Sequence, residues 1–569
     1  MTMKPCVITT LLALSCALAG CSAKYYRKSA DRESYGVIAE KTPRVPNMDP
    51  RFTIEQTNAL SLEGLRAVTE AEESLGTDGQ SEIGAGIISL EKALDIAVNH
   101  SRIYQNAKEN VYLQALALTL ARHEFEPIFF ARGHPDYQVT TEEVRVGIDP
   151  LTGLPNVISE DANLVEQHRI TGQGSVGANW LLKTGGQLSA AFATDFLRYL
   201  TGDPRTVTAS QLSATLLQPL WRGAGYKVAI ENLTQSERNV LYALRDFTQF
   251  RKRFSVQIAT AYYQVLQARD TVRNNWRGLQ NFRLNVERER ALAEEGRKTQ
   301  ASLGLLKQSE LSTETQWINA IRSYRQSLDN FKLQLGLTTD ANVVLDDQEL
   351  DRLKILHPDM SDEDAVKIAL VTRLDLYNVR EQHEDTARRI ELAINGLKPQ
   401  VDLVASASLS SKPETSGFPV PDISRYRWNA GFSFDLPLER KLERNVYRQA
   451  LIAHEQSARQ LEQAEDEIKL QVRADWRNLD QAKRSYEISE IGVELSARRV
   501  EEQQLRQELG LGTARDLVDA QNDLIASKNQ RTQALVSHTN ARLQFWNDMG
   551  ILYIKENGQW KEINDTKKF

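Results

Sequence analysis

The chain has only three cysteines in 569 residues, and all of them lie at its start: Cys6, Cys16 and Cys21. Beyond the N-terminus it has no uninterrupted apolar run of about 18 to 20 residues, so no transmembrane helix is expected. It also lacks an excess of basic residues, because its net charge is −6. Nucleic-acid binding through a basic surface is therefore not expected. Membrane-spanning β-strands are not excluded, since each gives a weaker sequence signal than a transmembrane helix.

The signatures of catalysis and metal binding are missing as well. None of the eight histidines falls at metal-ligand spacing, and the sequence has no H-E-x-x-H or G-K-[ST]. The stretch 172–177 matches G-x-G-x-x-G, but it lies inside an alternating strand pattern that no apolar helix follows, so a dinucleotide site is not expected there. We expect no enzyme, no cofactor and no metal site.

The first residues read as a secretory signal. Lys4 precedes an apolar stretch from Val7 to Leu18, and small residues follow. The sequence Leu18-Ala19-Gly20-Cys21 resembles the lipobox of bacterial lipoproteins, which implies that residues 1–20 are removed and that Cys21 carries acyl chains such as palmitate. By the same resemblance, Ser22 favours the outer membrane. The alternative is an ordinary signal peptide with an incidental cysteine.

Proline is absent from two long segments, 220–357 and 438–569. Because proline interrupts helices, these segments can hold very long ones. Their apolar residues recur at intervals of three, four or seven, as in a narrow coiled-coil stripe. The stripe residues are Val240, Leu244, Phe247, Phe254, Ile258 and Val265 in the first segment, and Ile468, Val472, Trp476 and Leu479 in the second.

The regions richer in proline alternate between apolar and polar residues, which predicts strands with two unlike faces. The best segments are 169–180, 187–196, 211–217, 401–410 and 427–436. Such ten-residue strands suit a membrane barrel around water, and a soluble sandwich is the alternative. Aromatic residues near their ends suit a membrane interface: Trp180, Tyr199, Trp221, Tyr426 and Trp428.

The sequence contains an internal repeat, so that two parts of the chain resemble each other. Residues 89–101 match residues 361–373 at an offset of 272. Pro219-Leu220 matches Pro437-Leu438, where each strand region gives way to a helix. Gly296-x-x-Thr299 matches Gly510-x-x-Thr513, where each long helix should reverse. Each copy therefore predicts a helix, strands, a very long helix, a turn and another long helix.

These features divide the chain into six parts. They are a signal peptide (1–20), an extended N-terminal segment (21–87), the first repeat (88–340), a linker (341–360), the second repeat (361–552) and a solvated polar tail (553–569). The second repeat supplies two strands. The first supplies two or four, because the segment 136–147, which would be needed as its fourth strand, alternates poorly.

From about 88 to 552 the sequence resembles the TolC family of outer-membrane efflux proteins. The most specific motif is G-x-x-T-x-x-D-[LV]-x-x-A-Q, here Gly510, Thr513, Asp516, Leu517, Ala520 and Gln521. The resemblance implies an α+β membrane protein, with a trimeric outer-membrane β-barrel continued by a long periplasmic α-helical barrel. It favours four strands per chain, hence 12 rather than 18 in the trimer.

The resemblance also implies a function. The homotrimer would be the exit duct of a tripartite efflux or secretion system, with a periplasmic adaptor and an inner-membrane pump as partners. Drugs, metal ions, glycolipids and secreted proteins all leave through ducts of this family. The alternative is a lipid-anchored periplasmic coiled-coil scaffold without channel activity, which would leave the duplicated strands without a role.

The most specific functional hypothesis concerns Asp516 and Asp519. Thr513-x-x-Asp516 is a capping box, and an acidic residue suits the first turn of a helix. Asp519 lies on the same face of the helix as Asp516, but the capping box does not account for it, so its presence needs another explanation. By resemblance, both would line a periplasmic gate that responds to cations, and the turns at Gly296, Thr299, Gly510 and Thr513 would dock the adaptor. The first copy departs from this pattern, with Ser302 and Leu305 in place of the two aspartates.

Overall fold

The computed structural model describes residues 22–55, 62, 64–144, 147–148, 155–156, 163–200, 206–412, 419–509 and 511–561. The chain forms two compact units. One comprises Met1–Ala115, Val240–Gln382 and Ala458–Phe569, and the other comprises Leu116–Asn239 and His383–Ser457. We call them the helical unit and the sheet unit.

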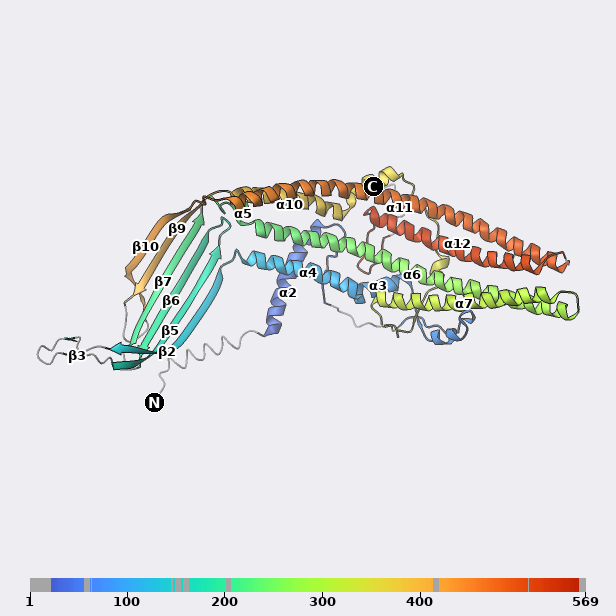
Figure 1. Ribbon diagram of the computed structural model, residues 1–569, viewed down its shortest axis with the longest axis horizontal. Coiled ribbons are helices and arrows are strands. Elements are labelled where there is room, and N and C mark those ends of the chain that lie inside the picture. The colour runs from blue at the N-terminus through green and yellow to red at the C-terminus, as the bar shows by residue number, and fades with distance from the viewer. Residues whose placement is uncertain are drawn as a thin grey trace. The chain divides into compact units, whose positions relative to one another are not determined.

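The sheet unit holds one antiparallel sheet, whose strands lie side by side in Figure 1. Its strands are β2 (Ile128–Val144), β5 (Asn163–Leu181), β6 (Gln187–Tyr199), β7 (Thr206–Pro219), β9 (Gln400–Ser411) and β10 (Pro421–Asp435). Their order across the sheet is β10-β9-β7-β6-β5-β2. Two short strands, β3 (Gly147–Ile148) and β4 (Pro155–Asn156), pair with each other separately.

The described sheet has six strands, whereas the family resemblance favoured four membrane strands per chain. The segment 136–147 alternates poorly, yet β2 pairs with β5 without a break from Ile128↔Asn179 to Val144↔Asn163. Pairing depends on backbone groups, which every residue of β2 except Pro135 supplies in full, and not on side-chain alternation. Alternation alone therefore missed a real strand.

Helices enter and leave this sheet at the ends of its strands. The helix α4 (Arg102–His123) precedes β2, while α5 (Tyr226–Ala229) and α6 (Glu231–Glu294) follow β7. In the second repeat α10 (Leu374–Gly396) precedes β9, and α11 (Lys441–Glu508) follows β10. Among the described helices, none combines the length and apolar character needed to cross a lipid bilayer.

The helical unit is dominated by two helical hairpins. The helix α6, of 64 residues, is followed by α7 (Gln300–Leu335), and α11, of 68 residues, is followed by α12 (Ala514–Asp548). As the absence of proline predicted, these helices run without a break.

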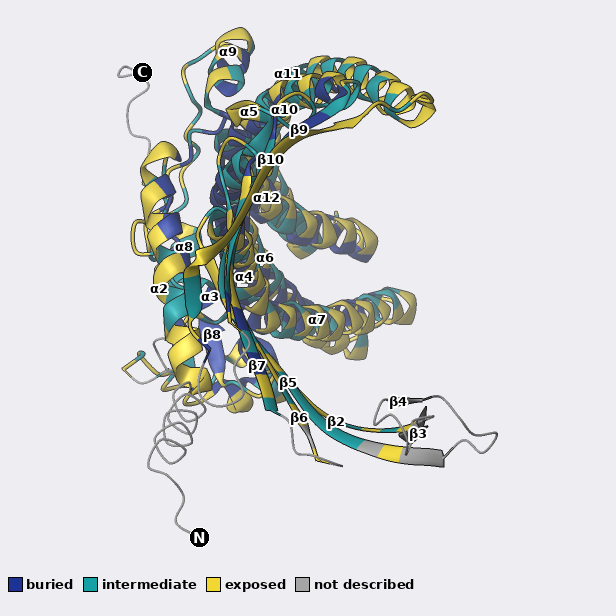
Figure 2. Cartoon of the chain, turned by 90° about the vertical axis from the view of Figure 1, so that its left-hand side faces the viewer, coloured by how far each residue is buried: buried dark blue, intermediate teal, exposed yellow. Residues whose placement is uncertain are grey.

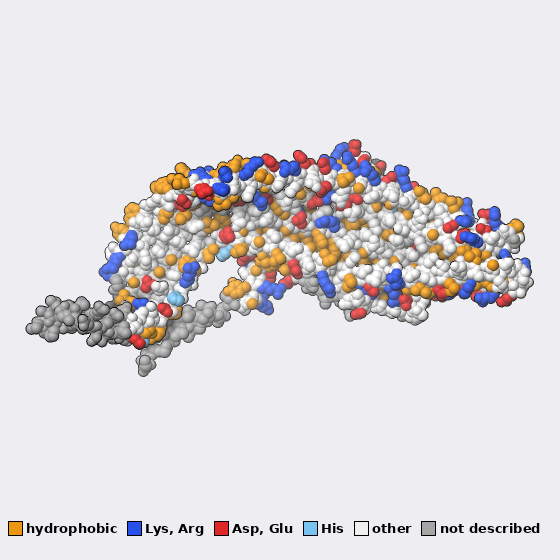
Figure 3. Space-filling view, viewed as in Figure 1, with side chains coloured by type: hydrophobic (Ala, Val, Ile, Leu, Met, Phe, Trp, Pro, Cys, Tyr) orange, Lys and Arg blue, Asp and Glu red, His pale blue; other side chains and the backbone are white. Residues whose placement is uncertain are grey.

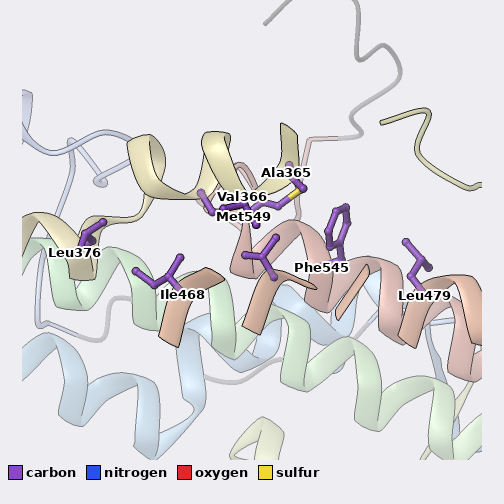
Figure 4. Packing of buried hydrophobic residues seen from close by; sticks show 9 residues of the cluster. Ala365, Val366, Leu376, Ile468, Leu479, Phe545 and Met549 are labelled. Carbon is purple, nitrogen blue, oxygen red and sulfur yellow. The ribbon is translucent and has the colours of Figure 1, made fainter. Parts of the chain in front are cut away.

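An apolar core joins α9 (Asp362–Thr372) and the start of α10 to the second hairpin (Figure 4). It includes residues of the stripe predicted from the sequence, and Val472 and Leu479 are completely buried in it. The full cluster is Ala365, Val366, Ala369, Leu376, Ile468, Val472, Leu479, Phe545 and Met549.

The internal repetition of the sequence has a counterpart in local geometry. Ser89 caps α3 (Leu90–His100) by accepting a hydrogen bond from the backbone N–H of Lys92 at 3.3 Å. Ser361 caps α9 by accepting one from Asp364 at 3.2 Å. The two caps stand 272 residues apart, which is the offset of the sequence repeat. The same local signal therefore starts the first helix of each repeat.

The N-terminal segment is not extended throughout, as the sequence had suggested. It begins with a helix, α2 (Ala23–Lys41), which has one exposed side and one buried side that includes Val37 and Ile38 (Figure 2). Asp31 of this helix accepts a hydrogen bond from the Tyr112 hydroxyl at 2.6 Å. The weak amphipathicity of α2 explains why the sequence did not reveal it, since tertiary packing supplies most helical stability.

Two further segments differ from expectation. The linker 341–360 contains β8 (Val343–Leu345), which pairs in parallel with β1 (Gly86–Ile88), and α8 (Gln348–Asp351). The tail is only partly exposed in its described part, to residue 561. Ile554 is buried and bridges to Trp560, while Gly558 sits so close to α3 that an added Cβ would lie 2.8 Å from Val98. A few apolar residues are enough to fold back a mostly polar segment.

Candidate functional site

The turn between α6 and α7 reverses the first long helix. Gly296 has a φ of +71°, a left-handed conformation that glycine adopts without steric cost. Thr299 is the N-cap of α7, and its side chain accepts a hydrogen bond from the backbone N–H of Ser302 at 3.2 Å. Both residues thus have a structural role in the turn, whatever else they do.

The turn between α11 and α12 has the same capping threonine, with an acidic residue added. Thr513 accepts a hydrogen bond from the Asp516 backbone N–H at 3.2 Å, and its hydroxyl donates to the Asp516 carboxylate at 2.6 Å. Gly510 lies outside the described residues. Gly512 packs closely on the end of α11, where an added Cβ would lie 3.0 Å from the backbone nitrogen of Gln507.

Asp516 and Asp519 are both exposed, one turn apart on the same side of α12. The hydrogen bond from Thr513 is the main reason that the pKa of Asp516 is lowered, with the positive charges of Arg499 and Arg506 as smaller causes. The capping box therefore keeps Asp516 ionised. In the single chain this carboxylate is stabilised as an anion, whereas the hypothesis of crowded carboxylates requires several chains.

Basic side chains lie among the acidic ones near this turn. Arg506 pairs with Glu502 at 2.7 Å, and Arg499 pairs with Asp523. The two hairpins are also linked here, because Arg288 pairs with Glu508 at 3.0 Å. Arg499 and Arg288 were not singled out from the sequence, since their pairing depends on contacts between helices, whereas Arg506 pairs within α11.

An apolar cluster fixes the two turns against each other within the helical unit. It contains Phe282 and Val286 of α6, Leu306 of α7, and Ala514, Val518 and Ile525 of α12. Beside it the Gln507 side-chain amide donates a hydrogen bond to the buried carboxylate of Glu289 at 3.2 Å. The two hairpins are therefore in contact close to both turns.

The strand-to-helix junctions lie where the sequence suggested, but other residues complete them. Pro219 is buried as the last residue of β7, and Pro437 lies between β10 and α11. The Gly223 backbone N–H donates to the Asn395 side chain at 2.7 Å, and the Arg440 guanidinium donates to the Leu397 carbonyl at 2.8 Å. Asn395 and Arg440 carry no motif that could have revealed this role.

The sheet has two unlike faces. Residues directly opposite each other on neighbouring strands share a face, so the register defines rows that cross the sheet. One apolar row is Ala131, Val176, Phe192, Leu212, Leu409 and Tyr426, and the next is Phe129, Ala178, Ala190, Ala214, Ala407 and Trp428. Figure 3 shows hydrophobic side chains gathered along β10, where Trp428, Phe432 and Phe434 are 62–70% exposed.

The opposite face is polar and its side chains are mostly small. One row is Ile128, Asn179, Ser189, Thr215, Ser406 and Asn429, and the next is Phe130, Gly177, Ala191, Ser213, Ser408 and Arg427. A sheet with one face for hydrocarbon and one for water matches the strand pattern of membrane barrels.

A dense ionic network ties the N-terminal segment to α6, and the sequence did not predict it. Arg269 of α6 donates to Glu72 at 2.6 Å and to Glu82 at 3.2 Å, and Arg273 pairs with Glu72 and with Asp347. Burial opposes ionisation of Glu72, but the two arginines outweigh it and lower its pKa to about 2.

Within the described ranges no group of three or more His, Cys, Asp or Glu could hold a metal ion. Cys21, the proposed acylation site, lies outside these ranges.

Comparison with known proteins gives one match to a family and several to folds. The sequence model of the family described as "Outer membrane efflux protein" matches residues 365–547, which lie in the second repeat. None of the curated proteins matches this sequence.

Solved structures share the fold over most of the chain. The open state of the MtrE outer membrane channel of Neisseria gonorrhoeae has a TM-score of 0.58 at 13% identity, covering 89% of this chain and 98% of that one. The CmeC outer membrane channel of Campylobacter jejuni has 0.55 at 12% identity, with 92% and 97% covered. The outer membrane protein VceC of Vibrio cholerae has 0.55 at 13%, with 81% and 96% covered.

At such identities the structures establish the fold alone. The fold is the one expected from the sequence, with long helices joined to antiparallel strands. The family whose model matches the second repeat is one of efflux proteins, in agreement with the expectation that the protein is not an enzyme. The chain is therefore similar to outer membrane efflux proteins, in sequence over residues 365–547 and in fold over most of its length.

Proposed function

We propose that three copies of this chain form the exit duct of a tripartite export system, open through the outer membrane and extended by helices into the periplasm. The observation that supports this most is the two-faced sheet, whose apolar rows continue across all six strands. Helices precede or follow its strands in both repeats, so the wall of a pore and the wall of a tunnel would be continuous in the chain.

The edges of the sheet support assembly from several copies. β2 and β10 are its outer strands, and each pairs with only one neighbour in the sheet. Backbone N–H and C=O groups in lipid must be satisfied within the protein, so an open edge cannot remain in a membrane. Pairing of β2 in one copy with β10 in the next would satisfy both edges and close a barrel.

Single-channel conductance of the purified protein in a planar lipid bilayer tests this function. A duct gives discrete conductance steps. The competing function, a lipid-anchored periplasmic scaffold, gives none. Protein that inserts into the bilayer as a trimer but never conducts, even with the proposed gate residues replaced, would contradict the proposal.

The lipid anchor is part of the same proposal. Acylation of Cys21 would attach the mature chain to the outer membrane, and each buried methylene contributes about 0.8 kcal/mol. Cys21→Ser should abolish lipid attachment, while the barrel can still insert. Mass spectrometry of the mature N-terminus decides the matter, because an unmodified Cys21 rules the anchor out.

The two helix turns would dock the periplasmic adaptor, which connects the duct to an inner-membrane pump. Gly296 has a left-handed conformation in the first turn, and Thr299 and Thr513 cap the returning helices. A bulky residue in place of Gly296 or Gly510 should stop export while trimer and barrel remain intact. Crosslinking in cells would show whether the adaptor is lost. Normal export from these variants would exclude a docking role.

Asp516 and Asp519 would form the periplasmic gate. In a trimer each aspartate occurs three times around one axis, so like charges would attract cations and lower the cost of opening. Replacing both by alanine should weaken divalent-cation block and cation preference. The two single variants are matched controls, because only Asp516 belongs to the capping box. A double variant that is blocked like the parent would leave the aspartates with a capping role alone.

A further inference from the structure

The two repeats contribute unequally to the sheet. The second repeat supplies β9 and β10, whereas the first supplies β2, β5, β6 and β7. The strands that border helices are β2 and β7 in the first repeat, so the additional pair is the hairpin of β5 and β6. The question is whether this hairpin belongs to the membrane wall or is an accessory outside it.

The hairpin is fully incorporated into the ladder. β5 pairs with β2 on one side and with β6 on the other. β6 pairs in turn with β7 from Gln187↔Leu217 to Arg198↔Thr206. The hairpin therefore separates β2 from β7 and is not appended to an edge. Removing it would require new pairing between β2 and β7.

The hairpin also continues both faces of the sheet. Val176 and Phe192 stand in the apolar row between Ala131 of β2 and Leu212 of β7. On the other face, Ser189 continues the polar row to Thr215. An accessory hairpin in water would have no reason to carry the apolar face in register with its neighbours.

The turn of the hairpin lies at the helical end of the sheet. The Thr184 hydroxyl donates a hydrogen bond to the Gln218 side chain at 3.0 Å, next to Pro219, where β7 ends. Gly185, with a φ of +89°, is so close to this junction that an added Cβ would lie 2.6 Å from the Gly223 carbonyl oxygen. The hairpin therefore spans the sheet from its far end to the helix junction.

The length of the hairpin is sufficient for a full crossing. A membrane strand needs about 9 to 11 residues. β5 has 19 residues and β6 has 13. Both strands can cross the hydrocarbon layer, and neither needs the loop at the far end to do so.

We infer that the β5–β6 hairpin is part of the membrane wall, and that three copies close an 18-stranded barrel instead of the 12-stranded one that the family resemblance suggested. This inference rests on the proposed function, because it assumes three copies and a membrane barrel. Barrel diameter grows roughly in proportion to strand number, so the exit is about 1.5 times as wide as with 12 strands.

The width and lining define the class of cargo. Barrels of 16 to 18 strands leave an aqueous channel. The central part of the polar face is lined by serine, threonine, asparagine, glycine and alanine side chains in β5, β6, β7 and β9. Such a wall hydrogen-bonds with water and hydroxyl groups, and Arg132, Asp195 and Arg427 add charges of both signs to the same face. The exit therefore suits bulky, hydrated polymers, as well as small solutes.

Cysteine substitutions along β6 test the position of the hairpin. The mature chain has no cysteine after residue 21, so a single introduced thiol can be followed. Ala191→Cys and Ala193→Cys should react with a charged thiol reagent in water. Phe192→Cys should resist it by at least tenfold, and a fluorophore attached there before reconstitution should be quenched by brominated lipid. Equal reactivity of the three sites would overturn the inference.

A matched series on β7 separates this inference from the proposed function. Gln211→Cys and Ser213→Cys on the polar face, with Leu212→Cys on the apolar face, lie in a strand that both barrel sizes require. If β7 alternates and β6 does not, the wide barrel is wrong and the duct remains. If neither strand alternates, the membrane barrel itself is wrong.

The width can be measured with polymers. A variant lacking Asn163–Arg205 would join β2 to β7 through residues 145–162 and retain four strands. Polyethylene glycols of graded size, added on the external side during conductance recordings, report the largest polymer that enters. The parent should admit polymers of about 1.5-fold larger hydrodynamic radius than the variant. Equal limits would overturn the inference, and if the variant fails to fold, the cysteine series still decides it.

Discussion

Thr513 and Asp516 exchange two hydrogen bonds at the start of α12, one from the Asp516 backbone N–H and one to its carboxylate. The corresponding position in the first repeat is Ser302, whose hydroxyl donates instead to the Thr299 carbonyl at 2.7 Å. The two turns therefore share a capping threonine, but only the second has a carboxylate. A charged gate would be contributed by one repeat alone.

Thr513→Ala should loosen the first turn of α12. Loss of an N-cap typically costs about 1 kcal/mol, which corresponds to roughly fivefold faster amide exchange in residues 514–517. Hydrogen exchange followed by mass spectrometry measures this. The same variant should raise the pKa of Asp516 toward its ordinary value, since the Thr513 hydrogen bond is the main cause of the lowering.

Thr299→Ala is the matched control for this prediction. It removes the equivalent cap from α7, so residues 300–303 should exchange faster to a similar degree. Channel properties that depend on Asp516 should not change in this variant. Unchanged exchange at both turns would mean that the caps contribute nothing measurable to these helices.

Gly336→Ala and Gly550→Ala should each destabilise the helical unit by about 2 to 4 kcal/mol. Both glycines have positive φ, +84° and +77°, where an alanine costs about 1 to 2 kcal/mol. An added Cβ at Gly336 would also collide with the His100 carbonyl, and one at Gly550 with Thr372. His100 and Thr372 are 272 residues apart, so the same contact recurs in both repeats.

Gly304→Ala serves as the control for both substitutions. Gly304 lies inside α7 with no atom near the added Cβ, so alanine should stabilise the helix by about 0.5 to 1 kcal/mol. Thermal unfolding in detergent should separate the three variants clearly. If Gly336→Ala and Gly304→Ala shift the unfolding temperature alike, the tight contact with His100 is not maintained in solution.

Glu72→Gln should release the segment around residue 72 from α6. Glu72 faces Arg269 and Arg273, and removing one partner from a largely buried pair costs about 3 kcal/mol. Limited proteolysis should then cut near residues 66–85 faster than in the parent. Glu73→Gln is the control, because its neighbour Glu72 makes the contacts with Arg269 and Arg273. Equal cutting of both variants would contradict the role of Glu72.

The same network predicts acid sensitivity. The pKa of Glu72 in the folded chain is lowered from 4.5 to about 2, so its contribution is complete above pH 5. That contribution is lost as the pH falls from about 4.5 to 2, because the unfolded chain binds a proton first. In Glu72→Gln the thermal stability of this segment should lose this dependence. If the thermal stability of Glu72→Gln depends on pH between 4.5 and 2 as that of the parent does, other carboxylates cause the dependence.

The sequence predicted most of the architecture, for reasons that particular residues make clear. Proline-free segments predicted α6 and α11, and Ser89 and Ser361 marked the first helix of each repeat, because these signals are local. Alternation predicted β5, β6, β7, β9 and β10. It failed for β2, where pairing with β5 does not need an apolar face.

The parts that the sequence did not reveal depend on distant contacts. The helix α2 is held by packing of residues such as Val37 and by the Asp31–Tyr112 hydrogen bond. The pairing of Arg269 with Glu72 joins residues 197 positions apart, and no motif marks it. At the candidate gate, the motif indicated Asp516 and Thr513, whereas the neighbouring arginines emerged only from the fold.

Two titratable groups of the helical unit, one partly buried and one fully buried, should give opposite pH dependences. Burial raises the pKa of Asp475 from 3.8 to about 7, assisted by the nearby carboxyl of Asp548 and only partly offset by Arg373. Burial lowers the pKa of His538 from 6.5 to about 4, assisted by the positive charge of Arg542. Both ring nitrogens of His538 are buried without a hydrogen-bond partner among the described residues.

The signs follow from which state binds the proton. Between pH 4 and 7 folded Asp475 holds a proton that the unfolded chain releases, so its contribution to stability falls as the pH rises. Between pH 4 and 6.5 the unfolded chain protonates His538 while the folded chain does not, so that contribution rises with pH. In the parent protein the two contributions to the free energy of unfolding change with pH in opposite directions. Together they should therefore change its stability little between pH 4 and 6.5.

Single substitutions should uncover each slope. In Asp475→Asn only His538 still titrates, so the unfolding temperature of this variant should rise as the pH increases from 4 to 6.5. His538→Gln leaves Asp475, so it should fall over pH 4 to 7, with changes on the order of 2 kcal/mol in each case. The double variant should again be nearly flat. A slope in His538→Gln that does not fall would contradict the raised pKa of Asp475, and a slope in Asp475→Asn that does not rise would contradict the lowered pKa of His538.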